Sequence, residues 1–197
     1  MLRRIQIAKS AAGDNKFRWM RQNDPAEVLT TLIEGLENVF PNWKVCPIGV
    51  RSYDTCRKCS SERRAGHESK PFLVLNPKSN LDGSLEDSMA PEPLNNRICV
   101  ACDSSQISRR VLVKSAPEVL VIQLNRVLPD GTKDPTIVDF PSVLSLPCRK
   151  HGQVQPVAYD LRSVICHQGD SSIRGHYFTY ANRDGKWYLF NDEKVTA

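Results

Sequence analysis

The sequence predicts an α+β fold from three observations: a well-capped helix near the start, a cysteine-rich segment after it, and strand-forming runs in the second half. At 197 residues the chain suits one domain, large enough to bury roughly 70% of the surface of its unfolded form. Its net charge of +5 is spread along the chain without a Lys- or Arg-rich block, so no nucleic-acid partner is expected.

The sequence shows neither a membrane span nor an export signal. No apolar run approaches the ~20 residues that a membrane helix needs, and charged residues interrupt the start too often for a signal peptide. We therefore expect an intracellular location, in the cytoplasm or the nucleus, and no membrane partner. In that setting the seven cysteines are predicted to be thiols or metal ligands rather than disulfides.

A helix is predicted over residues 25–40. Asp24 suits the N-cap, Pro25 the first helical position, and Glu27 stands three residues after the cap. Pro41 ends the pattern. Capping alone would be a sufficient role for Asp24 and Glu27 in most chains. The apolar residues that repeat with helical period are Val28, Leu29, Leu32, Ile33, Leu36, Val39 and Phe40.

Two C-x-x-C pairs give the most specific local signal. They are Cys56 with Cys59 and Cys99 with Cys102, and four thiolates in this pattern suit a tetrahedral Zn²⁺. Residues 76–98 between them are rich in polar residues and proline, which predicts a loop or finger inserted between the two pairs. Four protein ligands leave no open position, so the zinc would be structural. A redox pair or unrelated core cysteines are the alternatives.

The second half is predicted to form a mostly antiparallel sheet. Its runs are rich in β-branched and aromatic residues and are separated by Pro, Gly and Asp turns. The runs are 111–114, 119–127, 137–140, 157–167, 176–182 and 186–191. The remaining cysteines, Cys46, Cys148 and Cys166, are expected to be buried or incidental thiols.

The last two runs form a predicted hairpin. Asp184-Gly185 is a strong signal for a type I′ turn, which would pair Arg183 with Lys186. Counting back through this register places Asn191 opposite Phe178. Because side chains alternate along a strand, one face would carry His176, Phe178, Asn191 and Glu193, and the other Asp192.

This register brings a histidine and an amide together. Asn191 would be the diagonal neighbour of His176, roughly 7–8 Å away between their backbones and within reach of the imidazole. A histidine oriented by an amide is two-thirds of a nucleophilic triad of the cysteine-protease kind. The alternative is an ordinary amphipathic hairpin with a polar pair.

Four segments in this order resemble the ubiquitin-specific protease family of cysteine deubiquitinases. Residues 22–29 resemble the Q-x-D-A-x-E-F-L helix, with Pro25 and Val28 as departures, and the two cysteine pairs match the zinc-binding fingers. Residues 117–126 resemble the P-x-V-L-x-x-x-L-K-R-F strand, with Asn125 in place of Lys and Val127 in place of Phe. Residues 159–192 match the histidine box.

The resemblance implies a papain-like cysteine protease fold. It would consist of a partial thumb over residues 1–44, zinc-binding fingers over 45–115 and an antiparallel β palm over 116–197. It also implies cleavage of isopeptide or peptide bonds after the C-terminus of ubiquitin, with ubiquitin or ubiquitinated proteins as partners. The implied cofactor is structural Zn²⁺.

The resemblance also assigns roles to individual residues. His176 would be the general base and Asn191 the group that orients it, with Asp192 as a nearby auxiliary. The carboxylates of the first helix would face the basic tail of ubiquitin. A glycine beside the base would leave a narrow channel open for the diglycine end of ubiquitin. The ubiquitin-binding set implied in this way is Asp24, Glu27, His167, Gly175 and Tyr177.

The printed sequence lacks two segments of the family. The nucleophilic cysteine of the family lies in an N-x-G-N-T-C-Y-x-N-S stretch upstream of the first helix, and no such stretch occurs here. The final Y-x-L-F-Y strand is missing too. We therefore expect residues 1–197 to be one domain truncated at both ends, and inactive alone.

Three functions follow as alternatives. The first is an active deubiquitinase of which this chain is a part. The second is a ubiquitin-binding scaffold without catalysis, and the third is an unrelated zinc-ribbon protein that binds nucleic acid.

Overall fold

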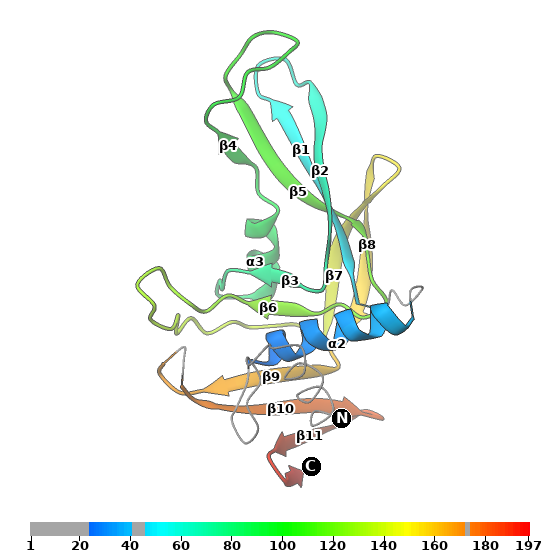
Figure 1. Ribbon diagram of the computed structural model, residues 1–197, viewed down its shortest axis with the longest axis vertical. Helices are drawn as coiled ribbons and strands as arrows, with labels where there is room; N and C mark the ends of the chain where they lie inside the picture. Colours follow the sequence, from blue (N-terminus) through cyan, green and yellow to red (C-terminus); the bar gives the residue numbers. More distant parts are fainter. Residues whose placement is uncertain (1–23, 41–45, 172–173) are drawn as a thin grey trace. The chain divides into compact units, whose positions relative to one another are not determined.

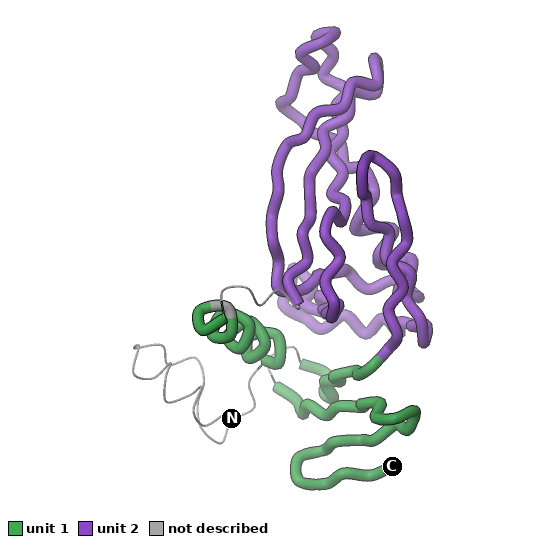
Figure 2. The backbone as a smooth tube through the Cα atoms, turned by 90° about the vertical axis from the view of Figure 1, so that its right-hand side faces the viewer, with its two compact units in different colours: residues 1–43, 162–197 green, residues 44–161 purple. Residues whose placement is uncertain are grey.

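A computed structural model describes residues 24–40, 46–171 and 174–197. The chain divides into two compact units, one made of residues 1–43 and 162–197 and the other of residues 44–161 (Figure 2). The described residues contain helices and predominantly antiparallel sheets, which confirms the predicted α+β class. Among the described residues, no helix is both long and apolar enough to cross a membrane.

Helix α2, Pro25–Val39, forms where the sequence predicted it. The carboxylate of Asp24 accepts a hydrogen bond from the backbone N–H of Ala26 at 2.7 Å, so the N-cap is confirmed. Of the apolar stripe, Ile33 is buried at 3% exposure, whereas Val39 and Phe40 are 67% and 57% exposed. The predicted stripe is therefore buried in its middle and open at its C-terminal end.

The larger unit is built on one sheet with the strand order β2-β1-β5-β7-β8 (Figure 1). A short strand, β4, pairs with the first three residues of β5, Ile107 to Arg109. All pairs in this sheet are antiparallel except β5 with β7, which is parallel. Its strands are β1 (Ile48–Cys56), β2 (Glu62–Lys70), β4 (Glu92–Leu94), β5 (Ile107–Ser115), β7 (Val143–Lys150) and β8 (Gln153–Asp160).

The segment between the cysteine pairs is more ordered than the predicted loop. It contains β4 and helix α3, Leu81–Ser88. Asn80 caps this helix by accepting from the N–H of Gly83 at 2.7 Å, and Leu85 is buried at 3% exposure. Beside it, β3 (Leu73–Leu75) pairs in parallel with β6 (Ile122–Leu124). Residues 76–98 are therefore an inserted segment, as predicted, and they contain a helix and a short strand of their own.

The core of this unit lies where the central strands meet β3 and α3. Cys148 belongs to it and has no exposed surface, in agreement with the prediction of a buried thiol. The buried residues of the cluster are Ile48, Val50, Leu73, Leu75, Leu85, Val113, Leu146 and Cys148.

The smaller unit carries a four-stranded antiparallel sheet with the order β12-β11-β10-β9. Its strands are β9 (Ser163–Gln168), β10 (His176–Arg183), β11 (Lys186–Asn191) and β12 (Lys194–Thr196). Arg183 pairs with Lys186, and Asp184 and Gly185 between them have φ values of +53° and +82°. Positive φ at both central positions is what a type I′ turn requires, so the predicted turn and register are confirmed.

Three of the predicted strands differ from the structure. Residues 137–140 form no strand: Asp139 makes an isolated bridge to Asn80, and Ile137 is 83% exposed. Prolines flank this run on both sides and provide no N–H for a ladder. Within the run 119–127 only β6 forms a strand. The run 157–167 is divided between β8 and β9.

Candidate functional site

The end of the β10–β11 hairpin brings His176 and Asn191 together. His176 is the first residue of β10 and Asn191 the last of β11. Nε2 of His176 lies 2.5 Å from Oδ1 of Asn191. The imidazole also stacks on the ring of Phe178, with centroids 6.5 Å apart. The strand register thus produces the contact that the sequence predicted.

Asp192 lies closer to His176 than the alternation of side chains along the strand predicted. Its Oδ2 is 3.9 Å from Nε2 of His176, although strict alternation would have placed it on the other face. The reason is that β11 ends at Asn191, which pairs with Lys194, so Asp192 and Glu193 form a turn in which Asp192 has φ +53°. The predictions that Asp192 points away and that Glu193 faces His176 were therefore wrong.

The relative positions favour Asn191 as the partner of the ring. The side chain of Asp192 is 75% exposed, so water competes for its carboxylate. Asn191 is only partly exposed and in hydrogen-bonding contact.

Gly175 lies against its neighbours so closely that no side chain fits there. A Cβ at this position would overlap the imidazole of His167 and the carbonyl oxygen of Gln168. His167 pairs with Tyr177 across β9 and β10, and their rings lie 4.6 Å apart. These three members of the predicted ubiquitin-binding set therefore lie together, beside His176.

The N-cap of α2 acts electrostatically on the same strand. Burial raises the pKa of Tyr177, and the negative charge of Asp24 raises it further. The carboxylate of Asp24 is exposed and commits one oxygen to the cap, whereas Glu27 is exposed with its side chain turned to solvent.

The four predicted zinc ligands converge in the larger unit. Their Sγ atoms all lie within 4.8 Å of one another. Cys56 and Cys102 are 3.7 Å apart, and Cys59 and Cys99 are 3.6 Å apart. A tetrahedron of sulfur atoms at Zn–S distances of ~2.3 Å has edges of ~3.8 Å. The cluster therefore has the dimensions that Zn²⁺ needs.

The two C-x-x-C turns are built alike. In the first, the N–H of Ser60 donates to the carbonyl of Cys56, and the N–H of Cys56 donates to the carbonyl of Ser61. The second turn repeats both bonds, with Cys99, Asp103 and Ser104 in the equivalent positions. Ser60 and Asp103 also share positive φ values, of 59° and 52°. The sequence analysis missed these supporting residues, although each directly follows its cysteine pair.

The environment of the thiols suits a cation. A hydrogen bond from Ser61 is the main cause that lowers the pKa of Cys99 to about 6. At Cys102 a backbone hydrogen bond from Ser104 lowers the pKa of the thiol. Burial and the neighbouring thiols act in the opposite direction and together raise this pKa to about 12. Four soft sulfur donors at tetrahedral spacing fit Zn²⁺, which would neutralise half of the charge of four thiolates.

The other cysteines have the surroundings of inert thiols. Burial raises the pKa of Cys46 and of Cys166, which disfavours the reactive thiolate.

Comparison with known proteins connects both sites to one family. Residues 5–197 match the family described as ubiquitin carboxyl-terminal hydrolase. The chain belongs to this family.

Individual relatives of this hydrolase-family domain are much longer than it is. Ubiquitin carboxyl-terminal hydrolase 48 of Danio rerio is 31% identical over 160 residues, which cover 75% of this chain and 15% of that protein. Ubiquitin carboxyl-terminal hydrolase 26 of Oryza sativa subsp. japonica is 28% identical over 200 residues, which cover 89% of this chain and 18% of that protein. The chain therefore spans less than a fifth of the length of these two relatives.

Solved structures establish the fold of the domain. The SAGA Ubp8/Sgf11/Sus1/Sgf73 DUB module bound to ubiquitin aldehyde matches with a TM-score of 0.80 at 23% identity, covering 97% of this chain and 47% of that chain. The same module bound to monoubiquitin matches with a TM-score of 0.77. The expected papain-like fold of a ubiquitin-specific protease domain is thereby confirmed.

Proposed function

We propose that this domain takes part in thiol-dependent hydrolysis of the isopeptide or peptide bond that follows the C-terminus of ubiquitin. The contact between His176 and Asn191 carries the proposal, since it supplies a base and its orienting group in a domain of a hydrolase family. Asp192 serves as an auxiliary carboxylate at longer range.

The geometry of this contact assigns the two ring nitrogens. An amide oxygen only accepts hydrogen bonds, so Nε2 of His176 must donate to Oδ1 of Asn191. In the neutral ring the lone pair then lies on Nδ1. Nδ1 is therefore the atom that takes the proton of a cysteine thiol.

The reaction then proceeds as a proton transfer followed by acyl transfer. The thiolate attacks the carbonyl carbon of the last ubiquitin residue, and the proton on Nδ1 passes to the leaving amine. Water hydrolyses the thioester with His176 again acting as base. In the family the thiol belongs to the N-x-G-N-T-C-Y-x-N-S segment, and the reaction requires a polypeptide that carries it.

The ubiquitin-binding residues are proposed to act around the same strand. The exposed carboxylates of Asp24 and Glu27 would attract the basic tail of ubiquitin. The ring pair of His167 and Tyr177, with Gly175 lying against it, would form the wall along which the diglycine end passes.

We further propose that the four cysteines hold one structural Zn²⁺. Purified protein should contain about one zinc per chain, because structural sites of this kind contribute folding free energy directly. Cys99→Ser should lose the metal, measured by atomic emission, whereas Cys166→Ser should keep it. Equal zinc contents in the two variants would contradict the site. Both zinc-bound thiolates and a reactive thiol suit the reducing conditions of the cytoplasm or nucleus.

Two measurements test the proposed function. The 197-residue chain should bind ubiquitin in isothermal titration calorimetry, and Glu27→Lys should weaken that binding. The full gene product should also be labelled by a ubiquitin probe with a C-terminal electrophile, and should lose peptidase activity with His176→Ala. Binding without labelling would identify a non-catalytic ubiquitin-binding scaffold. Absence of both would overturn the proposal.

A further inference from the structure

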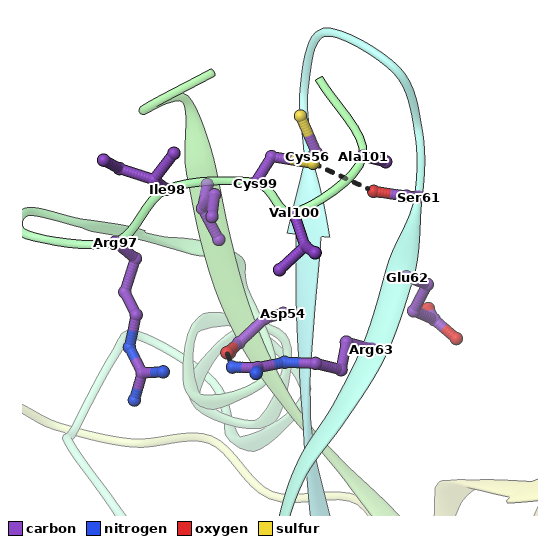
Figure 3. Close-up of a pocket in the computed structure, with 11 residues that line it drawn as sticks. Asp54, Cys56, Ser61, Glu62, Arg63, Arg97, Ile98, Cys99, Val100 and Ala101 are labelled. Carbon is purple, nitrogen blue, oxygen red and sulfur yellow. Dashed lines mark hydrogen bonds and ion pairs between the residues drawn. The ribbon is translucent and has the colours of Figure 1, made fainter. Parts of the chain in front are cut away.

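A pocket lies on one side of the cysteine cluster in the larger unit. Figure 3 shows sulfur atoms at one end and the ion pair between Asp54 and Arg63 at the other. Its volume is about 230 Å³, below the ~300–1,000 Å³ of pockets that enclose whole small molecules. The size suits one side chain of a partner rather than a cofactor.

Aliphatic side chains line the pocket and face water. Ile98 and Val100, which flank the buried Cys99, are 67% and 92% exposed, while Ile107, which also lines the pocket, is buried. Burial of such side chains against a partner is favourable, because it removes apolar surface from water. The turn that begins at Cys99 is closed by backbone hydrogen bonds between Cys99 and Asp103 and between Cys99 and Ser104. These bonds restrain the backbone of Val100, so less conformational entropy is lost when a partner docks on it.

Among the residues that the structure describes, the ion pairs at the opposite end of the pocket leave Arg97 without a partner. The carboxylate of Asp54 accepts two hydrogen bonds from the guanidinium of Arg109, at 2.7 and 3.0 Å, and one from that of Arg63, at 3.2 Å. Glu62 is occupied by Arg149 at 3.0 Å. The side chain of Arg97 makes no hydrogen bond or ion pair with any residue that the structure describes.

The position of Arg97 makes this charge available to a ligand. In Figure 3 its guanidinium extends to the end of the pocket away from the sulfur atoms. A bound carboxylate would thus meet a free guanidinium without approaching the thiolates, and Arg prefers such bidentate pairing.

We propose that this pocket docks an extended segment of a partner protein that carries one aliphatic or phenylalanine side chain next to an aspartate or glutamate. The apolar side chain packs on Ile98, Val100 and Ile107, and the carboxylate pairs with Arg97. This function is additional to ubiquitin hydrolysis and does not rest on it. It gives the zinc turn a second role as a recognition element.

Selection from a random peptide library displayed on phage, against the zinc-loaded 197-residue chain, tests the proposal. Enriched peptides should combine an apolar residue with Asp or Glu within a few positions. A synthetic peptide of the enriched sequence should bind at least about 10-fold more weakly to Val100→Asp and to Arg97→Glu, a loss equivalent to ~1.4 kcal/mol. Replacing its acidic residue with lysine should restore binding to Arg97→Glu.

The control variant is Ile137→Asp, because Ile137 is 83% exposed in the same unit and does not line the pocket. It should bind the peptide like the wild type, and all variants should retain their zinc. Basic peptides, no enrichment, or peptides indifferent to Val100→Asp would overturn the proposal. A loss of ubiquitin binding in Val100→Asp would overturn it as well, by assigning the pocket to ubiquitin itself.

Discussion

Asn191 and Asp192 are neighbours in sequence but stand in different relations to the imidazole of His176. Asn191→Ala removes the acceptor at 2.5 Å, whereas Asp192→Ala removes an exposed carboxylate at 3.9 Å. In a polypeptide with the thiol segment, we expect Asn191→Ala to lower hydrolysis of a fluorogenic ubiquitin amide by about 10²–10⁴-fold. Asp192→Ala should lower it much less.

The isolated chain offers a readout of the same contact that does not need the thiol. Nitrogen NMR of the histidine ring reports which ring nitrogen carries the proton. In Asp192→Ala the proton of the neutral His176 ring should stay on Nε2, whereas in Asn191→Ala it should be distributed over both nitrogens. Equal changes in the two variants would contradict the assignment of Asn191 as the orienting residue.

Two glycines should respond oppositely to the same substitution. Gly175→Ala forces a methyl group into the ring of His167 and a backbone carbonyl, and overpacking of this kind costs about 1–3 kcal/mol or more. Gly35→Ala, on helix α2, meets no atom within 4 Å and should stabilise by about 0.5–1 kcal/mol. Urea unfolding measures both changes, and a shared sign would contradict the described packing.

Asp54 is a buried carboxylate whose partners are arginines on β2 and β5. The hydrogen bond from Arg109 is the main cause that lowers its pKa, and Arg63 contributes to the same shift. Asp54→Asn should lower the free energy of unfolding at pH 7 by about 1–3 kcal/mol, because the partners then face an amide. An aspartate in the unfolded chain titrates near pH ~3.9.

The pH dependence of this effect follows from the sign of the shift. Because the folded pKa lies below the unfolded one, the ion pairs stabilise fully above about pH 4 and lose their contribution as the pH falls through the folded pKa. The difference between wild type and Asp54→Asn should therefore shrink under acid conditions. Asp184→Asn, at a 95% exposed position, is the control and should differ little at any pH.

At the scale of elements, the sequence alone was enough to predict a helix or a turn where all of its local signals occur together. Helix α2 has its cap, its proline and its apolar period in one continuous stretch, and the β10–β11 turn is specified by Asp184-Gly185. Helix α3 has a cap residue but neither a proline at its start nor a good helix-forming body, because glycine, serine and aspartate are poor helix formers. It forms because Asn80 caps it and Leu85 enters a core made by distant strands.

Strand β2 is a second element that local sequence signals do not reveal. Its sequence is almost entirely charged or polar and its side chains are nearly all exposed, so no alternation marks it. It is held by the ladder with β1. The approach of Asp192 to His176 was equally hidden, because it depends on β12 pairing back on β11.

At the scale of the whole molecule, the two units have separate sheets and only one contains the cysteine cluster. Removal of the proposed Zn²⁺ by a chelator should therefore raise amide hydrogen exchange in β1 and β5, whose ends carry or adjoin the cysteines, and leave β10 and β11 protected. Mass spectrometry of peptides from each strand measures this. Equal loss of protection in all four strands would show that the units unfold together.

The convergence of the two cysteine turns also bears on how the chain tolerates change in length. Once Cys59 and Cys99 are joined, the connection between them is a closed loop, and each doubling of a flexible loop costs only about 0.6 kcal/mol. Within it, the stretch after β4 is exposed and contains Asn96 at φ +87°. New sequence inserted there would fall outside both cysteine pairs and the core strands, which makes this point a natural place for a domain to acquire an accessory module.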